Sequence, residues 1–201
     1  MQFKSSEIRW FSREKQVLWD IFESLEMLGP GDPEEERTDY YLNSDTPNSG
    51  IKIRDGKHEL KVKISQDEKL GYGILQHWSK WSYSEEENIL NSVNSDLLID
   101  WLKMTKNRAK KSYKITAEKK VEFTSEENIE EGFDVEFTRF EIPSLEITGF
   151  TLGLEAFSGK NNSEENLYLA LRALQLKTSH LKNLKSCSYP EFLNDLFSEG
   201  R

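Results

Sequence analysis

The pattern of apolar and polar positions changes along the first third of the chain. Residues 2–11 favour an extended backbone, and residues 17–25 then carry apolar side chains at helical spacing behind Ser12, a residue type common at helix N-caps. A period of two follows and is clearest at residues 51–64, where Asp55-Gly56 predicts a tight turn. This part of the chain therefore predicts a strand, a helix and an antiparallel hairpin.

The rest of the chain alternates between strand-like and helical patterns, with turn residues and polar loops between them. Together the segments predict an α+β fold built on antiparallel strands. The expected features are a loop at 29–36, a strand at 38–42, a helix from a capping box at 84–87 to Leu102, strands at 113–123, 133–142 and 148–157, a helix capped by Ser163, and a terminal helix with a capping box at 188–191.

Composition adds an unusual polarity to this picture. The chain has 201 residues, of which 36% are hydrophobic and 31% are charged. The hydrophobic share is below that of most globular domains, although aromatic residues at 11% supply large buried areas. We expect a single domain spanning residues 1–201, with an unusually polar interior or surface.

The charge balance narrows the possible partners. A net charge of -9 and an isoelectric point near 5.0 argue against nucleic-acid binding, which needs a basic surface, but they leave room for a local basic site. Cys187 is the single cysteine, and the sequence starts with no secretory leader, so we expect a cytoplasmic protein. No apolar run is long enough to cross a bilayer, and we expect no membrane partner.

The hairpin at 51–64 concentrates charge on one face. Its apolar residues alternate with a second set of side chains that must point the other way. One interpretation is a solvated outer face, which is the usual meaning of a charge run. The other is a binding face, because like charges opposed across strands destabilise a hairpin unless an anion or carboxylate lies between them. The charged set is Lys52, Arg54, Glu59, Lys61 and Lys63.

Carboxylates on other strands could complete such a face. Glu7 and Arg9 share a face of the first strand, Glu136 lies on a later strand, and Glu155 follows Gly153 on the last one. If these faces converge, they form a groove or barrel interior of mixed charge. Cations there suit phosphate oxygens, and carboxylates suit a hard metal ion.

The ordered set of these strings resembles the CYTH domain, also called the triphosphate tunnel metalloenzyme family. The resemblance implies an eight-stranded antiparallel β tunnel with helices packed outside. It also implies hydrolysis of inorganic or organic triphosphates; adenylate cyclase activity, known in the same family, is less favoured because nothing here selects adenine. The strings are Glu7-Ile-Arg9, Arg37-Thr-Asp-Tyr-Tyr41, Ile51-Lys-Ile-Arg54, Glu59-Leu-Lys-Val-Lys63, Val135-Glu-Phe-Thr-Arg139, Leu152-Gly-Leu-Glu155 and Ser188-Tyr-Pro-Glu-Phe-Leu193.

The resemblance also assigns roles to residues. Glu7, Glu136 and Glu155 are the expected catalytic and metal-binding carboxylates, with Mg or Mn as the metal. The expected phosphate-binding cations are Arg9, Lys52, Arg54, Lys61, Lys63 and Lys120.

The chain departs from the family signature Glu-x-Glu-x-Lys. It has Ser5 at the first acidic position and Arg9 in place of lysine, and Gly153 stands where many members have a second acidic residue. The leading hypothesis is a metal-dependent triphosphatase, acting on a small phosphorylated ligand as a monomer or homodimer. The alternative is a module that binds triphosphate, polyphosphate or another anion without hydrolysis. A third possibility is a scaffold whose polar face meets only water or a partner protein.

Overall fold

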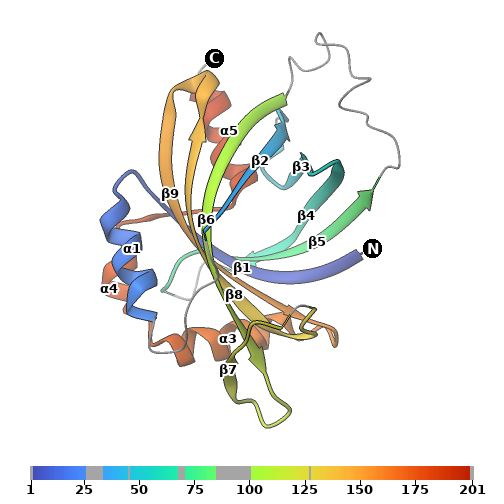
Figure 1. The fold of residues 1–201 in the computed structure, drawn as a ribbon, viewed down its shortest axis with the longest axis vertical. Helices are drawn as coiled ribbons and strands as arrows, with labels where there is room; N and C mark the ends of the chain where they lie inside the picture. The colour runs from blue at the N-terminus through green and yellow to red at the C-terminus, as the bar shows by residue number, and fades with distance from the viewer. Residues whose placement is uncertain are drawn as a thin grey trace.

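The computed structural model describes residues 2–25, 34–44, 46–67, 71–84, 101–126 and 128–199. Long antiparallel strands dominate it, and they curve around a common axis (Figure 1). The strands are β1 (Gln2–Ser12), β2 (Glu35–Leu42), β3 (Ser49–Arg54), β4 (Lys57–Asp67), β5 (Leu75–Ser84), β6 (Trp101–Ile115), β7 (Val121–Phe123), β8 (Glu131–Ile142), β9 (Ile147–Ser158) and β10 (Lys185–Ser186).

Eight of these strands close into a barrel. The order around the ring is β1, β5, β4, β3, β2, β6, β8 and β9, and β9 pairs with β1 to complete it. The strand pairs are antiparallel throughout, and short β7 and β10 pair with β6 and β1 outside the ring. The predicted α+β fold with an eight-stranded antiparallel barrel is confirmed.

The predicted hairpin is the β3–β4 pair. Asp55 and Gly56 have φ values of 49° and 71°, which is the left-handed conformation that a two-residue hairpin turn requires. Lys52 pairs with Glu59, and Gly50 pairs with Lys61, so these side chains share one face of the sheet. In the closed barrel this face is the inner one, because Lys52, Glu59 and Lys61 all line the cavity described below.

The main apolar core lies outside the barrel. Helices α1 (Lys15–Ser24) and α3 (Ser163–Leu174) pack on the outer side of β1, β8 and β9. Alternation along β8 directs Phe133, Val135 and Phe137 toward these helices, while the residues between them face the barrel interior. Buried apolar area on the outer face therefore stabilises a barrel whose interior is polar.

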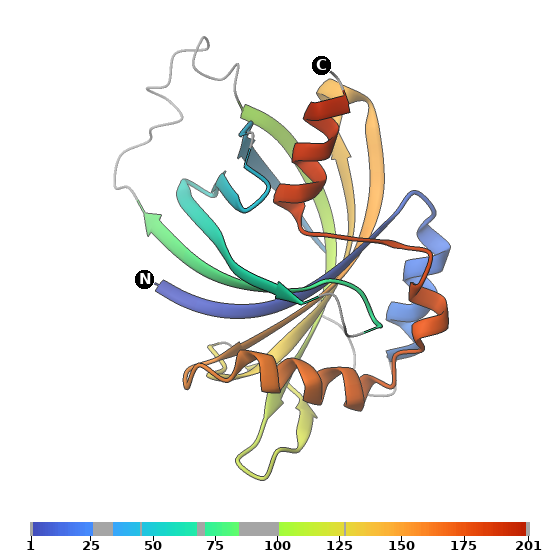
Figure 2. The same ribbon diagram turned by 180° about the vertical axis from the view of Figure 1, so that it is seen from behind.

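The terminal helix closes one end of the barrel. Helix α5 (Tyr189–Glu199), which follows the short α4 (Thr178–Leu181), packs on inward-facing residues such as Phe11 and Phe140. Figure 2 shows α5 lying across the concave side of the strands. The predicted capping box is present, since Ser188 donates to Glu191 from both its backbone N–H (2.8 Å) and its hydroxyl (2.9 Å).

Several expectations about local structure were wrong. The expected strand at 113–123 is the end of β6, a turn and β7. Helix α3 has Asn162 as its N-cap and begins at Ser163, whose hydroxyl contacts that of Ser6 (2.9 Å) instead of capping the helix. Trp101 and Leu102 begin strand β6 instead of ending a helix; residues 85–100 of that expected helix lie outside the described residues. Helix α1 begins at Lys15, and Ser12 instead accepts a hydrogen bond from the N–H of Glu14 (3.0 Å). Residues 35 and 36 of the expected loop belong to β2, while residues 29–33 are not described.

Among the described residues, no helix has the length and apolar character that crossing a membrane would require.

Candidate functional site

A charged cavity occupies the middle of the barrel. It has a volume of about 380 Å³, within the range typical of small-molecule sites. Tyr189 and Pro190 of α5 line it where the helix closes the barrel. Nine cationic and four carboxylate side chains line it. We call it the barrel cavity; its charged lining residues are Glu7, Arg9, Arg37, Lys52, Arg54, Lys57, Glu59, Lys61, Lys80, Lys106, Arg108, Glu136 and Glu155.

The barrel cavity is positive although the chain as a whole is negative. Asp39, which is fully buried, lies behind the lining and pairs with Lys106, so it adds one further carboxylate. Even with Asp39 counted, the cations exceed the carboxylates by four in a chain of net charge -9. An excess of this size within a confined space favours a bound polyanion.

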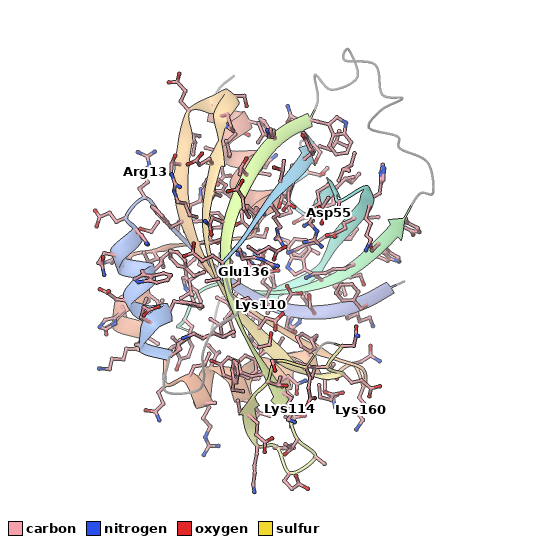
Figure 3. The ribbon with its side chains drawn as sticks, viewed as in Figure 1. Arg13, Asp55, Lys110, Lys114, Glu136 and Lys160 are labelled. Atoms are coloured by element: carbon pink, nitrogen blue, oxygen red, sulfur yellow. The ribbon has the colours of Figure 1, made fainter. Side chains whose placement is uncertain are left out.

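Carboxylates gather on the wall formed by β1, β8 and β9, and Arg9 is at its centre. The Arg9 guanidinium donates from Nε to Glu7 (2.9 Å) and from Nη1 to Glu136 (3.2 Å) and Thr151 (3.0 Å). Figure 3 shows Glu136 in the middle of the molecule, among strands that carry the other inward side chains. The carboxylate wall is therefore already neutralised in part by a buried cation.

Two carboxylates of this wall, Glu7 and Glu136, are held ionised. Burial opposes ionisation of Glu7, but the charges of Lys61 and Arg9 outweigh it and hold the pKa of this carboxyl well below its usual range. The same balance, with Arg9 and Arg108 as cations, lowers the pKa of Glu136. Lys61 donates to Glu7 at 2.6 Å, and Lys80 pairs with Glu155.

Cations crowd the opposite wall, formed by β2 to β6. Burial lowers the pKa values of Lys52, Lys61 and Lys106 to about 8, and neighbouring cations add to this effect. Burial is the main cause of these shifts, so in the free cavity the charged form of each lysine is less favoured than in water. An anion bound between them would favour the charged form.

Lys106 lies at the closed end of the cavity and contacts residues of β2 and α5. Its ammonium donates to Asp39 (2.9 Å) and to the hydroxyl of Tyr41 (2.6 Å), and it lies 3.8 Å from the centre of the Tyr189 ring. Lys106 is 1% exposed, so its charge depends on these contacts. Strand β2, strand β6 and helix α5 are thereby joined at one point.

Seven of the nine residues predicted from the sequence line the barrel cavity, and two do not. Lys63 faces the interior but pairs with Glu191 of α5 at 2.7 Å, next to an irregularity in the β4–β5 pairing, and so belongs to the closed end. Lys120 is exposed beyond the end of β6, near the turn that leads to β7. The seven are Glu7, Arg9, Lys52, Arg54, Lys61, Glu136 and Glu155.

The sequence prediction missed several cations of the cavity. Lys106 and Arg108 belong to a basic stretch with alternating spacing, but the helix expected as far as Leu102 hid the start of their strand. Lys80 lies between Trp78 and Trp81, in a segment without the alternating charges that mark the inner face of the hairpin. Arg37 and Asp39 are in a string that the resemblance included without assigning them a role.

The carboxylates that the resemblance assigned to a metal ion do not form a site for one. Within the part of the chain that the structure describes, no three His, Cys, Asp or Glu side chains are grouped so that they could hold a metal ion. The Arg9 guanidinium separates Glu7 from Glu136, and Lys80 engages Glu155. Hard divalent ions need several oxygen ligands at once, so these residues do not fit a Mg²⁺ or Mn²⁺ site of the implied kind.

Comparisons with known proteins give structural neighbours only. No protein-family model and no curated protein matches the sequence. The PH1012 protein from Pyrococcus horikoshii OT3 matches with a TM-score of 0.48 and 19% identity, over 94% of this chain and 98% of that chain. The Mediator head module of Schizosaccharomyces pombe contains a chain that matches with a TM-score of 0.46 and 6% identity, over 92% of this chain and 98% of that chain.

The Pct1 RNA triphosphatase of Schizosaccharomyces pombe matches with a TM-score of 0.42 and 10% identity, over 90% of this chain and 83% of that chain. At these scores and identities, the neighbours assign neither a family nor a function to this chain. Membership of the CYTH family stays a prediction, while the closed antiparallel barrel that it implied is present in the strand pairing.

Proposed function

We propose that the protein binds a small polyanion of the triphosphate class inside the barrel cavity. The observation that supports this most is the excess of cations over carboxylates in a confined space, within a chain of negative net charge. Lysine and arginine donors converge from β2, β3, β4, β5 and β6, which suits a ligand carrying charge along its length.

The closed end of the cavity limits the form of the ligand. Tyr189 and Pro190 line the cavity at the first turn of α5, and the Cγ of Pro190 lies only 2.8 Å from the point where a Cβ on Gly50 would stand. A helix packed this closely on β3 favours a terminal polyphosphate group over a chain that runs through the barrel.

Calorimetric titration tests this proposal. Inorganic tripolyphosphate should bind with one-to-one stoichiometry and more tightly than pyrophosphate or phosphate, because each added phosphoryl group meets further cations. The double variant Lys52→Ala with Arg54→Ala should weaken binding by about 100-fold or more, since each charged hydrogen bond is worth roughly 1.5–3 kcal/mol. The matched control is Lys119→Ala with Arg139→Ala, which removes one exposed lysine and one exposed arginine outside the cavity.

Equal losses in the two double variants would show that affinity reflects overall charge, and would overturn the proposal. Absence of tripolyphosphate binding to the wild-type protein would overturn it as well.

Hydrolysis of the bound triphosphate is the second candidate, and Glu155 is the residue that favours it. Its side chain is 31% exposed, whereas those of Glu7 and Glu136 are 3% and 14% exposed. A carboxylate with this access could orient a water molecule toward a terminal phosphoryl group. The test is phosphate release from tripolyphosphate and nucleoside triphosphates with Mg or Mn between about pH 6 and 10. No turnover above a Glu155→Gln control would leave binding as the function.

A further inference from the structure

Arg9 reaches across one whole strand to make its contacts. It lies on β1, whereas its partner Glu136 lies on β8, and β9 runs between these two strands. In the strand pairing, Gly153 of β9 is in register with Arg9 on one side and with Glu136 on the other. The guanidinium therefore passes over Gly153 to reach Glu136.

Gly153 leaves the space that Arg9 fills. A Cβ at this position would stand 2.5 Å from Nη2 and 2.6 Å from Cζ of Arg9, closer than nonbonded atoms approach. The backbone of Gly153 does not adopt a positive φ, so space and not backbone conformation accounts for the missing side chain. Arg9 and Gly153 thus form a matched pair, because the Arg9 side chain occupies the space that a side chain at residue 153 would need.

The surroundings fix the guanidinium in this place. Arg9 is 7% exposed, and its Cζ lies 4.8 Å from the centre of the Tyr189 ring. Its planar guanidinium donates hydrogen bonds to Glu7, Glu136 and Thr151 at the same time. A lysine ammonium is a point charge without the forked, planar geometry that spans two carboxylates. The three departures from the family signature noted in the sequence, at residues 5, 9 and 153, include both members of this pair.

We propose that Arg9 is a built-in counter-cation, standing between Glu7 and Glu136 where the resemblance would place a divalent metal ion. The barrel cavity then binds its polyanion without a metal. This inference rests on the proposed function and adds to it the nature of the cation that neutralises the carboxylate wall. Because Arg9 also lines the cavity, the same guanidinium faces the bound ligand.

The experiment compares tripolyphosphate binding in EDTA and in Mn²⁺ by calorimetry, using the full chain. Wild-type affinity in EDTA should be at least equal to that in Mn²⁺, since Mn²⁺ removes part of the ligand's charge. In EDTA, Arg9→Ala and Gly153→Ala should each weaken binding about tenfold or more, the first by removing the guanidinium and the second by displacing it. Arg139→Ala, an exposed arginine on the outer side of β8, is the matched control and should bind as the wild type does.

Thermal unfolding of each variant shows which ones are folded at the titration temperature. If Arg9→Ala does not fold, Gly153→Ala and Arg9→Lys carry the test, because both keep the positive charge of residue 9. Direct titration of the wild-type protein with Mn²⁺ alone, followed by the electron paramagnetic resonance signal of the free ion, supplies a readout without phosphate and should show no stoichiometric site.

The possible results distinguish failure of the built-in counter-cation from failure of the proposed function. Binding that needs Mn²⁺, or that is tenfold tighter with it, would overturn the built-in counter-cation and leave the proposed function standing. Binding in EDTA that is unchanged by the folded variants of Arg9 and Gly153 would remove Arg9 from this role. Absence of binding under every condition would overturn the proposed function, and this inference with it.

Discussion

Proton uptake should accompany polyanion binding at mildly alkaline pH. Because Lys52, Lys61 and Lys106 have pKa values near 8, each is about half deprotonated at pH 8 in the free protein. A polyanion bound between them favours the ammonium form and raises all three pKa values. If each pKa rises by about two units, the lysines together take up about 1.5 protons per ligand at pH 8, but only about 0.1 at pH 6.5.

Calorimetry in buffers of different ionisation enthalpy measures this number directly. The ligand also exchanges protons with the solvent, so the informative quantity is a difference between proteins. Lys52→Arg and Lys106→Arg keep the positive charge, and arginine stays protonated throughout this pH range. At pH 8 each variant should take up about 0.5 proton fewer than the wild type, because one titrating lysine is gone and the contribution of the ligand cancels.

The affinity of the wild type should also fall more steeply than that of either variant as the pH rises from 7 to 9. The reasoning is refuted if the wild type and both arginine variants take up the same number of protons at pH 8. Such a result would mean that these lysines are already fully charged, or that the ligand binds elsewhere.

Three further predictions concern the stability of the barrel interior. Asp39→Asn should lower the free energy of unfolding by about 3–5 kcal/mol in urea denaturation at pH 7, because it leaves Lys106 buried without its carboxylate; a loss below about 1 kcal/mol would contradict the pairing. Glu7 takes up a proton near pH 4.5 in the unfolded chain and only at lower pH in the folded chain, so the free energy of unfolding should fall as the pH drops below about 4.5. Glu7→Gln should make the free energy of unfolding less dependent on pH in this range, and an unchanged dependence would contradict the lowered pKa of Glu7. Gly50→Ala should cost about 1–3 kcal/mol and speed hydrogen exchange in α5, because the new methyl meets Pro190; unchanged exchange would show that α5 does not depend on this contact.

The sequence predicted the strands of the charged hairpin and which side chains share a face. It could not show which face is inside, because alternation fixes two faces and only ring closure decides between them. In most sheets with one solvated face, the apolar side of a hairpin such as β3–β4 covers the core. Here helices α1 and α3 build the apolar core outside β1, β8 and β9, and this leaves the interior to Lys52, Glu59 and Lys61.

Local sequence patterns could not predict contacts between strands that are far apart in the chain. Arg9 and Gly153 each looked like a departure from a motif, and nothing in their local sequences pairs them. Their relation depends on the β1–β9 register, which brings residues 144 positions apart into contact. Lys106 was hidden for a different reason, since the helical pattern expected up to Leu102 continued into what is the start of strand β6.

A crystal structure of the protein grown with tripolyphosphate and EDTA is the most direct test of the central claim. The account predicts the ligand inside the barrel, with phosphate oxygens within hydrogen-bond distance of Lys52, Arg54 and Lys61 and its inner end facing Tyr189. Tripolyphosphate bound only to the outer surface, with the ion pairs of the barrel cavity unchanged, would contradict it.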